Sequence, residues 1–228
     1  MSDLVKGSNT NQPKAFDVRA YLDSVKAAPK LRGRVIFALD ATASRSETWK
    51  AATKLQIELF GAASNVDVQL VLYRGHECRA SRWFSSSTHL ADAMRSIHCV
   101  AGGTQIRRVL AHALKVSESS TLTRALVFVG DCFEEKIDEL APLARTLGEK
   151  RIPIFMIQEC GDENATSAFR QIAEASGGAH FRFDANAIDQ LRRLLRAIGE
   201  YVQTGNATAL KAVDALCLTA PTTKLLKP

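Results

Sequence analysis

Short apolar runs alternate along this chain with longer segments whose apolar residues recur every three or four positions. Each run is continuous and is followed by a polar or glycine-containing loop, which is typical of a strand buried on both faces of a sheet. The longer segments have the periodicity of amphipathic helices. The alternation predicts an α/β fold with a doubly wound, mostly parallel central sheet and helices on both of its faces.

The predicted elements follow one another in a regular order. Buried strands are expected at 34–40, 67–73, 125–129, 152–157 and 179–183, and helices at 46–62, 88–98, 105–117, from about 138, 165–176 and 186–203. Residues 78–84 alternate less regularly and include Arg79 and Arg82, so we expect an antiparallel hairpin partner at one edge of the sheet. Pro142 predicts a kink or a late start of the helix near residue 138.

Composition and the positions of glycine and proline residues divide the chain into three parts. Residues 1–32 are expected to form an N-terminal arm with a short helix at 16–27, residues 33–203 the α/β domain, and residues 204–228 a C-terminal tail that can add a helix near 207–217. A length of 228 residues suits one domain. The content of 46% hydrophobic and 24% charged residues excludes a disordered or collagen-like chain.

The sequence also argues against a membrane span, a secreted location and a nucleic-acid partner. No apolar run approaches the roughly 20 residues of a membrane-spanning helix, so we expect no membrane span. The first residues lack the features of a secretory signal, and the five cysteines include no Cys-x-x-Cys pair, which predicts reduced thiols and a cytoplasmic location. The net charge of +6 is spread along the chain, so we expect no nucleic-acid partner.

The residues with the clearest chemical potential follow the first predicted strand. Asp40 ends that strand, and the hydroxyl residues Thr42 and Ser44 follow at alternate positions. Alternate side chains of an extended segment point the same way, so these three groups can converge on one point. A set of oxygen donors suits a hard cation such as Mg²⁺ or Mn²⁺.

An ordinary structural role is the competing interpretation. Ser44 and Glu47 have the spacing of a helix capping box. Thr104 precedes a predicted helix, and Asp131 has a glutamate three positions later, so each is also a candidate helix cap. Capping explains neither Thr42 nor the place of Asp40 at a strand end.

The order of three motifs resembles the von Willebrand factor A domain. The motifs are Asp40-Ala-Thr-Ala-Ser44, then Gly102-Gly103-Thr104, then Asp131 after Val-Phe-Val-Gly, and the resemblance covers about residues 33–203. It implies a metal-ion-dependent adhesion site, built in that family from an Asp-x-Ser/Thr-x-Ser loop, a later Thr and a later Asp. Thr42 stands where the family often has Ser, and Gly130-Asp131-Cys132 stands where it commonly has Thr-Asp-Gly.

The resemblance also implies a role for each residue of the site. Thr42 and Ser44 would bind the metal directly, Thr104 directly or through water, and Asp40 and Asp131 largely through water. Hydroxyl ligands leave the charge of the cation only partly balanced, so it accepts a Glu or Asp side chain from a partner protein. We therefore expect a binding module and not an enzyme, with a partner that the resemblance suggests is an ATPase or a chaperone-like protein.

Two other functions remain open at this point. A Mg²⁺-dependent phosphotransferase could use Asp40 as its nucleophile, although haloacid-dehalogenase-like enzymes need a second Asp where this chain has Thr42. A scaffolding domain without a metal is the other alternative. Cys99 and Cys132 flank the expected site, either as a redox-sensitive pair or as small packing residues.

Overall fold

The computed structural model describes residues 32–41, 66–74, 77–97, 103–159, 161–183 and 188–218. The chain divides into two units, Met1–Lys30 and Leu31–Pro228, and all the described residues belong to the second. The helices predicted at 16–27 and 46–62 lie outside the described residues, as do Thr42 and Ser44.

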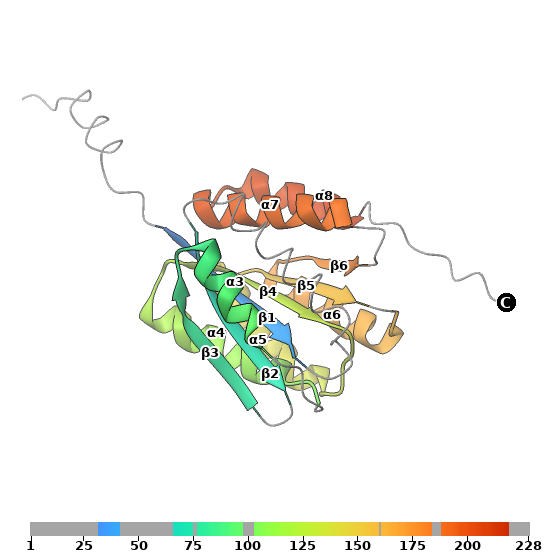
Figure 1. Ribbon diagram of the computed structural model, residues 1–228. Helices are drawn as coiled ribbons and strands as arrows, with labels where there is room; N and C mark the ends of the chain where they lie inside the picture. Colours follow the sequence, from blue (N-terminus) through green and yellow to red (C-terminus); the bar gives the residue numbers. More distant parts are fainter. Residues whose placement is uncertain are drawn as a thin grey trace, which may run out of the picture. The chain divides into compact units, whose positions relative to one another are not determined.

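A central sheet of six strands organises the described part of the second unit (Figure 1). The strands are β1 (Gly33–Asp40), β2 (Val66–Arg74), β3 (Glu77–Phe84), β4 (Thr123–Gly130), β5 (Ile154–Glu159) and β6 (His180–Phe183). Their order in the sheet is β3-β2-β1-β4-β5-β6, and all neighbours are parallel except β3, which runs antiparallel to β2 at the edge. This arrangement confirms the predicted sheet, including its antiparallel edge strand.

Helices cover both faces of the sheet, as the periodicity predicts. They are α3 (Ser87–Arg95), α4 (Ile106–Ser119), α5 (Ile137–Glu149), α6 (Glu163–Ser176), α7 (Ile188–Thr204) and α8 (Ala207–Leu218). Ile36 and Ala38 of β1 belong to an apolar cluster with residues of α4, α5 and α6. Val35, Phe37 and Leu39 belong to a second cluster with residues of α3, α7 and α8. Because both faces are buried, the strands are apolar without alternation.

Two helices show how local sequence features set helix limits. Asp162 caps the start of α6, accepting hydrogen bonds from the backbone N–H groups of Asn164 and Ala165, and Gly177 ends the helix in the left-handed conformation at φ 71°. In contrast, α5 begins at Ile137 and continues through Pro142. The start at Ile137 agrees with the helix expected from about residue 138, and Pro142 lies inside it.

The C-terminal helix packs on the domain. Val213 of α8 is 0% exposed and belongs to the same apolar cluster as Leu195 and Val202 of α7. Residues 207–218, which the sequence places in the tail, thus complete the cover of one face. No helix among the described residues is both long and apolar enough to cross a lipid bilayer.

The strand order indicates at which edge of the sheet a ligand would bind. The chain moves outward in one direction from β1 to β2 and β3, and in the opposite direction from β4 to β5 and β6. The order therefore reverses between β1 and β4, and such a switch point is where open α/β sheets bind ligands beyond the carboxyl ends of their strands. Asp40 and Gly130 are the last residues of these two strands.

Candidate metal centre

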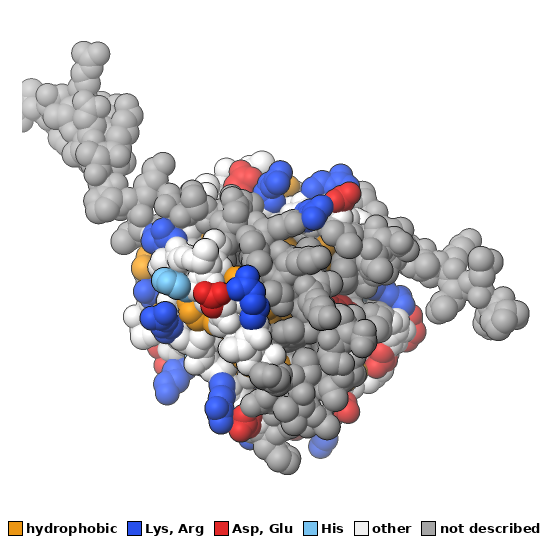
Figure 2. All heavy atoms as spheres, in the orientation of Figure 1, with side chains coloured by type: hydrophobic (Ala, Val, Ile, Leu, Met, Phe, Trp, Pro, Cys, Tyr) orange, Lys and Arg blue, Asp and Glu red, His pale blue; other side chains and the backbone are white. Residues whose placement is uncertain are grey.

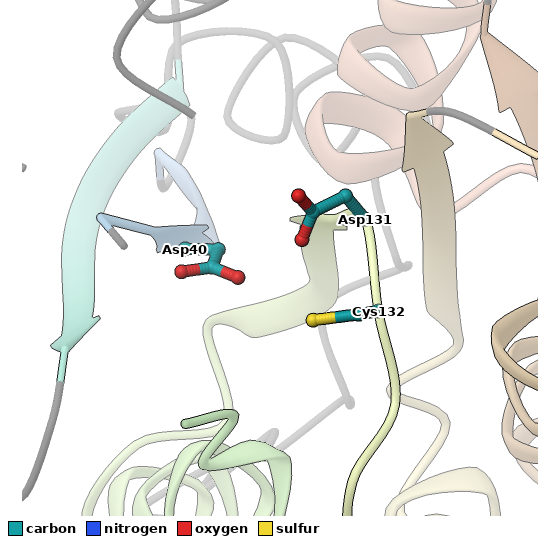
Figure 3. Close-up of side chains that lie close together, drawn as sticks. All are labelled: Asp40, Asp131 and Cys132. Atoms are coloured by element: carbon teal, nitrogen blue, oxygen red, sulfur yellow. The ribbon is translucent and has the colours of Figure 1, made fainter. Parts of the chain in front are cut away.

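Asp40 and Asp131 meet at the switch point. Asp40 is 0% exposed, and Asp131 directly follows β4. One carboxylate oxygen of each, together with the sulfur of Cys132, lie within 4.8 Å of one another. Figure 3 shows the three side chains directed toward one another between the ends of β1 and β4. The structure thus brings together two of the predicted site residues that are far apart in the sequence.

Strand register explains this convergence. Leu39 of β1 pairs with Val129 of β4 in the parallel ladder, so Asp40 lies level with Gly130 and one residue short of Asp131. Asp40 is also the last residue of a strand that is buried along its length, which keeps its carboxylate away from bulk solvent.

The electrostatic potential at this site is negative. Burial, followed by the charge and hydrogen bond of Asp131 and then the charges of Asp40 and Glu134, raises the pKa of the Cys132 thiol to about 12. Oδ1 of Asp131 is buried and has no hydrogen-bond partner within the part of the chain that the structure describes. A buried acceptor of this kind carries a desolvation penalty that a bound cation would remove.

Thr104 is held against the loop that contains Asp131. Its backbone N–H donates to Oε2 of Glu134 at 2.9 Å, and the backbone N–H of Glu134 donates to the Thr104 hydroxyl oxygen at 3.2 Å. Glu135 adds a second connection, because its carboxylate accepts from the N–H groups of Ile106 at 2.5 Å and Arg107 at 3.1 Å. Two consecutive glutamates therefore join the loop after β4 to the start of α4.

These contacts correct the capping interpretation of Thr104 and Asp131. The N-cap residue of α4 is Gln105, and the first N–H groups of that helix are satisfied by Glu135 from another loop. Asp131 caps no helix, since α5 begins six residues later, at Ile137, with Lys136 at its N-cap. Both residues are left available for the site, whereas Ser44 lies outside the described residues.

Crowding accounts for the glycine that precedes Asp131. A Cβ atom on Gly130 would lie 2.9 Å from the Phe128 ring and 3.1 Å from the Tyr73 hydroxyl. The Tyr73 and Phe128 rings are stacked at a centroid distance of 5.5 Å, and Tyr73 is 0% exposed. Two aromatic rings thus occupy the space that a threonine side chain would need at this position.

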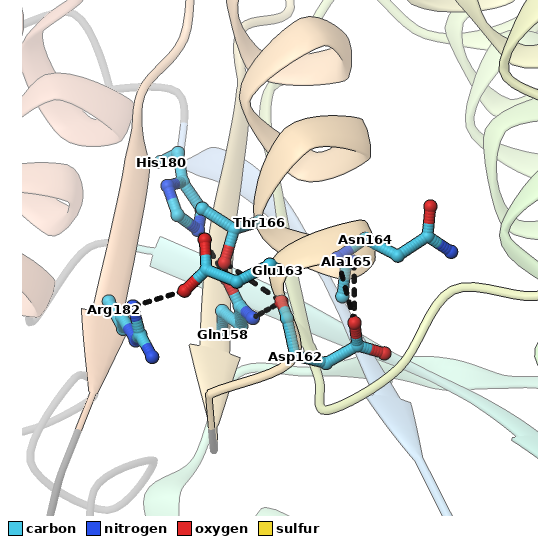
Figure 4. Close-up of polar contacts among 8 residues, drawn as sticks. All are labelled: Gln158, Asp162, Glu163, Asn164, Ala165, Thr166, His180 and Arg182. Carbon is cyan, nitrogen blue, oxygen red and sulfur yellow. Dashed lines mark hydrogen bonds and ion pairs between the residues drawn. The ribbon is translucent and has the colours of Figure 1, made fainter. Parts of the chain in front are cut away.

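A second polar cluster lies at the ends of β5 and β6 (Figure 4). The buried Gln158 amide donates to the Asp162 carbonyl at 2.8 Å, and its oxygen lies 2.9 Å from both the Thr166 hydroxyl and Nε2 of His180. Burial, and then the positive charges of Arg170 and Arg182, lower the pKa of His180 to about 4. This cluster satisfies its own polar atoms and orients the start of α6.

The donor set at the switch point fits a divalent cation. Asp40 and Asp131 offer carboxylate oxygens within 4.8 Å of each other, and Thr104 is hydrogen-bonded to Glu134 of the loop that contains Asp131. Carboxylates and hydroxyls are typical donors for Mg²⁺ and Mn²⁺. Sequence reasoning missed the bridging glutamates Glu134 and Glu135, which no local motif reveals. It placed Cys132 beside Asp131 but could not show that its sulfur also approaches Asp40.

The sequence matches no family model and no curated protein. The structure, however, resembles several solved ones. It aligns with the vWF domain of the type V pilus tip protein Mfa5 from Porphyromonas gingivalis at a TM-score of 0.62 and 13% identity, covering 78% of this chain and 99% of that chain. BatB from Bacteroides thetaiotaomicron gives a TM-score of 0.61 at 17% identity, covering 78% of this chain and 99% of that one.

A third similar structure is proximal thread matrix protein 1 from the mussel byssus, described with a zinc-occupied MIDAS motif. Its TM-score is 0.59 at 14% identity, covering 75% of this chain and 46% of that chain. The chain therefore has the von Willebrand factor A fold, and the resemblance found in the sequence is confirmed at the level of the fold.

Proposed function

We propose that this protein is a binding module that uses a divalent metal to hold a partner protein. Asp40, Thr104 and Asp131, with Thr42 and Ser44, which follow β1 in the sequence, would hold Mg²⁺ or Mn²⁺. The observation that carries this proposal is the convergence of the Asp40 and Asp131 oxygens within 4.8 Å, at the switch point of the sheet. The comparison structure with a zinc-occupied MIDAS motif supports a divalent ion at such a site.

The chain's own residues would prepare the site in two ways. The buried Asp40 carboxylate and the half-buried Asp131 carboxylate create the negative potential that attracts a cation. The Glu134 and Glu135 hydrogen bonds hold the Thr104 segment against the Asp131 loop. When bound, the metal supplies an electrophilic centre for an Asp or Glu side chain of the partner, and a carboxylate that is buried on contact forms a strong, charge-assisted anchor.

A binding role fits the site better than phosphotransfer. Haloacid-dehalogenase-like enzymes need a second Asp two positions after the nucleophile, where this chain has Thr42. Similar structures include a pilus adhesin, SpaC from Lactobacillus rhamnosus GG, and the pilus tip protein Mfa5. An ATPase or chaperone-like partner and a cytoplasmic location remain proposals from the sequence.

The first test measures metal binding by itself. Calorimetric titration of EDTA-stripped protein with Mg²⁺ and Mn²⁺ should show one site, which Asp40→Asn and Asp131→Asn abolish. Asp162→Asn is the matched control, because Asp162 lies at the same edge of the sheet but caps α6. Unchanged binding in Asp40→Asn and Asp131→Asn would refute the proposed site.

The second test measures partner binding. Pull-downs with wild-type protein should capture a partner in Mg²⁺, lose it in EDTA and recover it when Mg²⁺ is restored. Asp40→Asn should fail throughout, and Asp162→Asn should behave as wild type. A partner that stays bound in EDTA and to Asp40→Asn would show that adhesion does not depend on the metal.

A further inference from the structure

We propose that Cys132 is itself a ligand of this cation, and that its sulfur makes the site select borderline ions such as Zn²⁺ and Co²⁺ over Mg²⁺. This inference rests on the proposed metal site and names the class of ion that the site prefers. It concerns a residue that departs from the usual pattern of the fold, since Cys132 follows Asp131 where glycine is common.

The position of the sulfur is the first argument. Sγ of Cys132 lies within 4.8 Å of a carboxylate oxygen of both Asp40 and Asp131, and Figure 3 shows it directed toward Asp40. A tetrahedral zinc ion with bonds of about 2.0 Å to oxygen and 2.3 Å to sulfur keeps these atoms about 3.5 Å apart. The 4.8 Å limit exceeds that spacing by about 1.3 Å, so the three donors would move closer to one another on binding.

The backbone that directly follows Cys132 is anchored, which is the second argument. Phe133 is 8% exposed, and its carbonyl accepts a hydrogen bond from the Asn164 side chain at 3.0 Å. The next residue, Glu134, is held by its reciprocal hydrogen bonds with Thr104. These contacts hold the loop that carries Cys132 in place, as the positioning of a metal ligand requires.

The surroundings of the sulfur are the third argument. Cys78 packs against the apolar cluster beneath α4–α6, as a cysteine used for packing does. Cys132, in contrast, belongs to neither of the two apolar clusters formed by the described residues. Its polar neighbours are the Asp40 and Asp131 carboxylates. A cation bound between these groups would take the place of the thiol proton.

The ligand type determines which ion benefits. Thiolate sulfur is a soft donor that favours Zn²⁺ and Co²⁺, whereas Mg²⁺ uses oxygen and gains nothing from it. On binding Zn²⁺ as a thiolate, Cys132 would release its proton to solvent and add a third negative charge to those of Asp40 and Asp131. The zinc-loaded site would therefore attract a partner carboxylate less strongly than the magnesium-loaded site.

Spectroscopy of the cobalt-loaded protein tests the sulfur directly. EDTA-stripped full-length protein is titrated with Co²⁺, and we expect a near-ultraviolet sulfur-to-cobalt charge-transfer band in the wild type. Cys132→Ser and Cys132→Ala should lose the band, and Cys78→Ser should keep it. Zn²⁺ affinity, from competition with a chromophoric chelator, should fall more than about tenfold in Cys132→Ser, with Mg²⁺ affinity nearly unchanged.

The outcomes separate this inference from the proposed function. A band that persists in Cys132→Ser, or Co²⁺ binding to the wild type with no band, would overturn the sulfur ligand and leave the oxygen site intact. Failure of wild-type protein to bind Mg²⁺, Mn²⁺ and Co²⁺ alike would contradict the metal site, and with it this inference.

Discussion

Gly130 illustrates how single residues at the sheet edge are constrained by their neighbours. A side chain there would collide with the stacked Tyr73 and Phe128 rings. In a sheet packed on both faces, neither ring has space to move aside. The residue that precedes Asp131 is thus set by packing beneath the site as well as by the site itself.

We predict that Gly130→Ala costs about 1–3 kcal/mol in free energy of unfolding, the usual penalty for overpacking. Gly161→Ala is the control, because its new Cβ would meet only the end of the flexible Arg182 side chain. Urea unfolding of both variants measures the difference. Equal stability of Gly130→Ala and wild type would contradict the packing account.

The pKa of the single residue His180 makes the free energy of unfolding depend on pH. Its pKa is about 4 in the folded protein and near 6.5 when unfolded. Between these values the unfolded chain binds the proton and the folded chain does not, so stability is complete above pH 6.5 and falls as the pH drops toward 4. The loss can reach about 1.4 kcal/mol per pH unit and is smaller for a partly exposed side chain.

His180→Gln should therefore flatten the decline in stability between pH 6.5 and pH 4.5, because glutamine does not titrate. The measurement is urea unfolding of the two proteins at several pH values in this range. Parallel curves for variant and wild type would show that the histidine does not take part.

At the level of elements, the loop after β4 caps the N-terminus of α4, an earlier helix of the chain. Glu135 accepts hydrogen bonds from the first N–H groups of α4, and Glu134 holds Thr104. A negative charge at a helix N-terminus also interacts favourably with the helix dipole. The two loops are therefore coupled, and a change in one should reach the metal site through the other.

Glu135→Ala should lower the free energy of unfolding by about 0.5–2 kcal/mol, as the loss of a helix cap does. It should also weaken Mg²⁺ binding, because the segment that contains Thr104 is then held against the Asp131 loop by Glu134 alone. Glu139→Ala is the control, since that exposed carboxylate makes only a surface ion pair with Arg107 at 3.7 Å. Metal affinity that is unaffected in Glu135→Ala would show that the loops are independent.

For the whole molecule, the site joins the two halves of the sheet at its switch point. Asp40 ends β1 and Asp131 follows β4. One bound ion would therefore connect the half of the sheet formed by β3, β2 and β1 to the half formed by β4, β5 and β6. In Figure 2, the basic and acidic side chains of the described residues are interspersed on the visible face. Within α3, Arg95 and Asp92 form an ion pair at 2.6 Å.

Saturating metal should consequently stabilise the folded domain. An ion at 100 times its dissociation constant adds about 2.7 kcal/mol, which corresponds to a rise in Tm of roughly 5–10 °C for a domain of this size. Thermal unfolding of EDTA-stripped protein with and without Mn²⁺ measures the shift. Asp131→Asn should show none, and an equal shift in that variant would place the binding ion elsewhere.

Local periodicity in the sequence determined most of the fold. The apolar runs of β1 and β4 and the helical spacing of α4 and α6 are direct consequences of burial on two faces and on one face, so they can be recognised without a structure. The end of α6 at Gly177 could also be predicted, because glycine readily adopts the left-handed conformation that ends a helix. The oxygen-bearing residues Asp40, Thr104 and Asp131 could be named, because they follow strands or precede a helix.

Only the tertiary structure decided how these loops meet. That Asp40 approaches Asp131 depends on β1 pairing with β4, and that Glu135 caps α4 depends on the helices that share one face of the sheet. The approach of the Cys132 sulfur to Asp40 has the same origin. Such contacts join segments far apart in the chain, whereas sequence patterns record only the burial of neighbouring residues. The chemistry of the site is therefore set by strand order, which no single segment of the chain encodes.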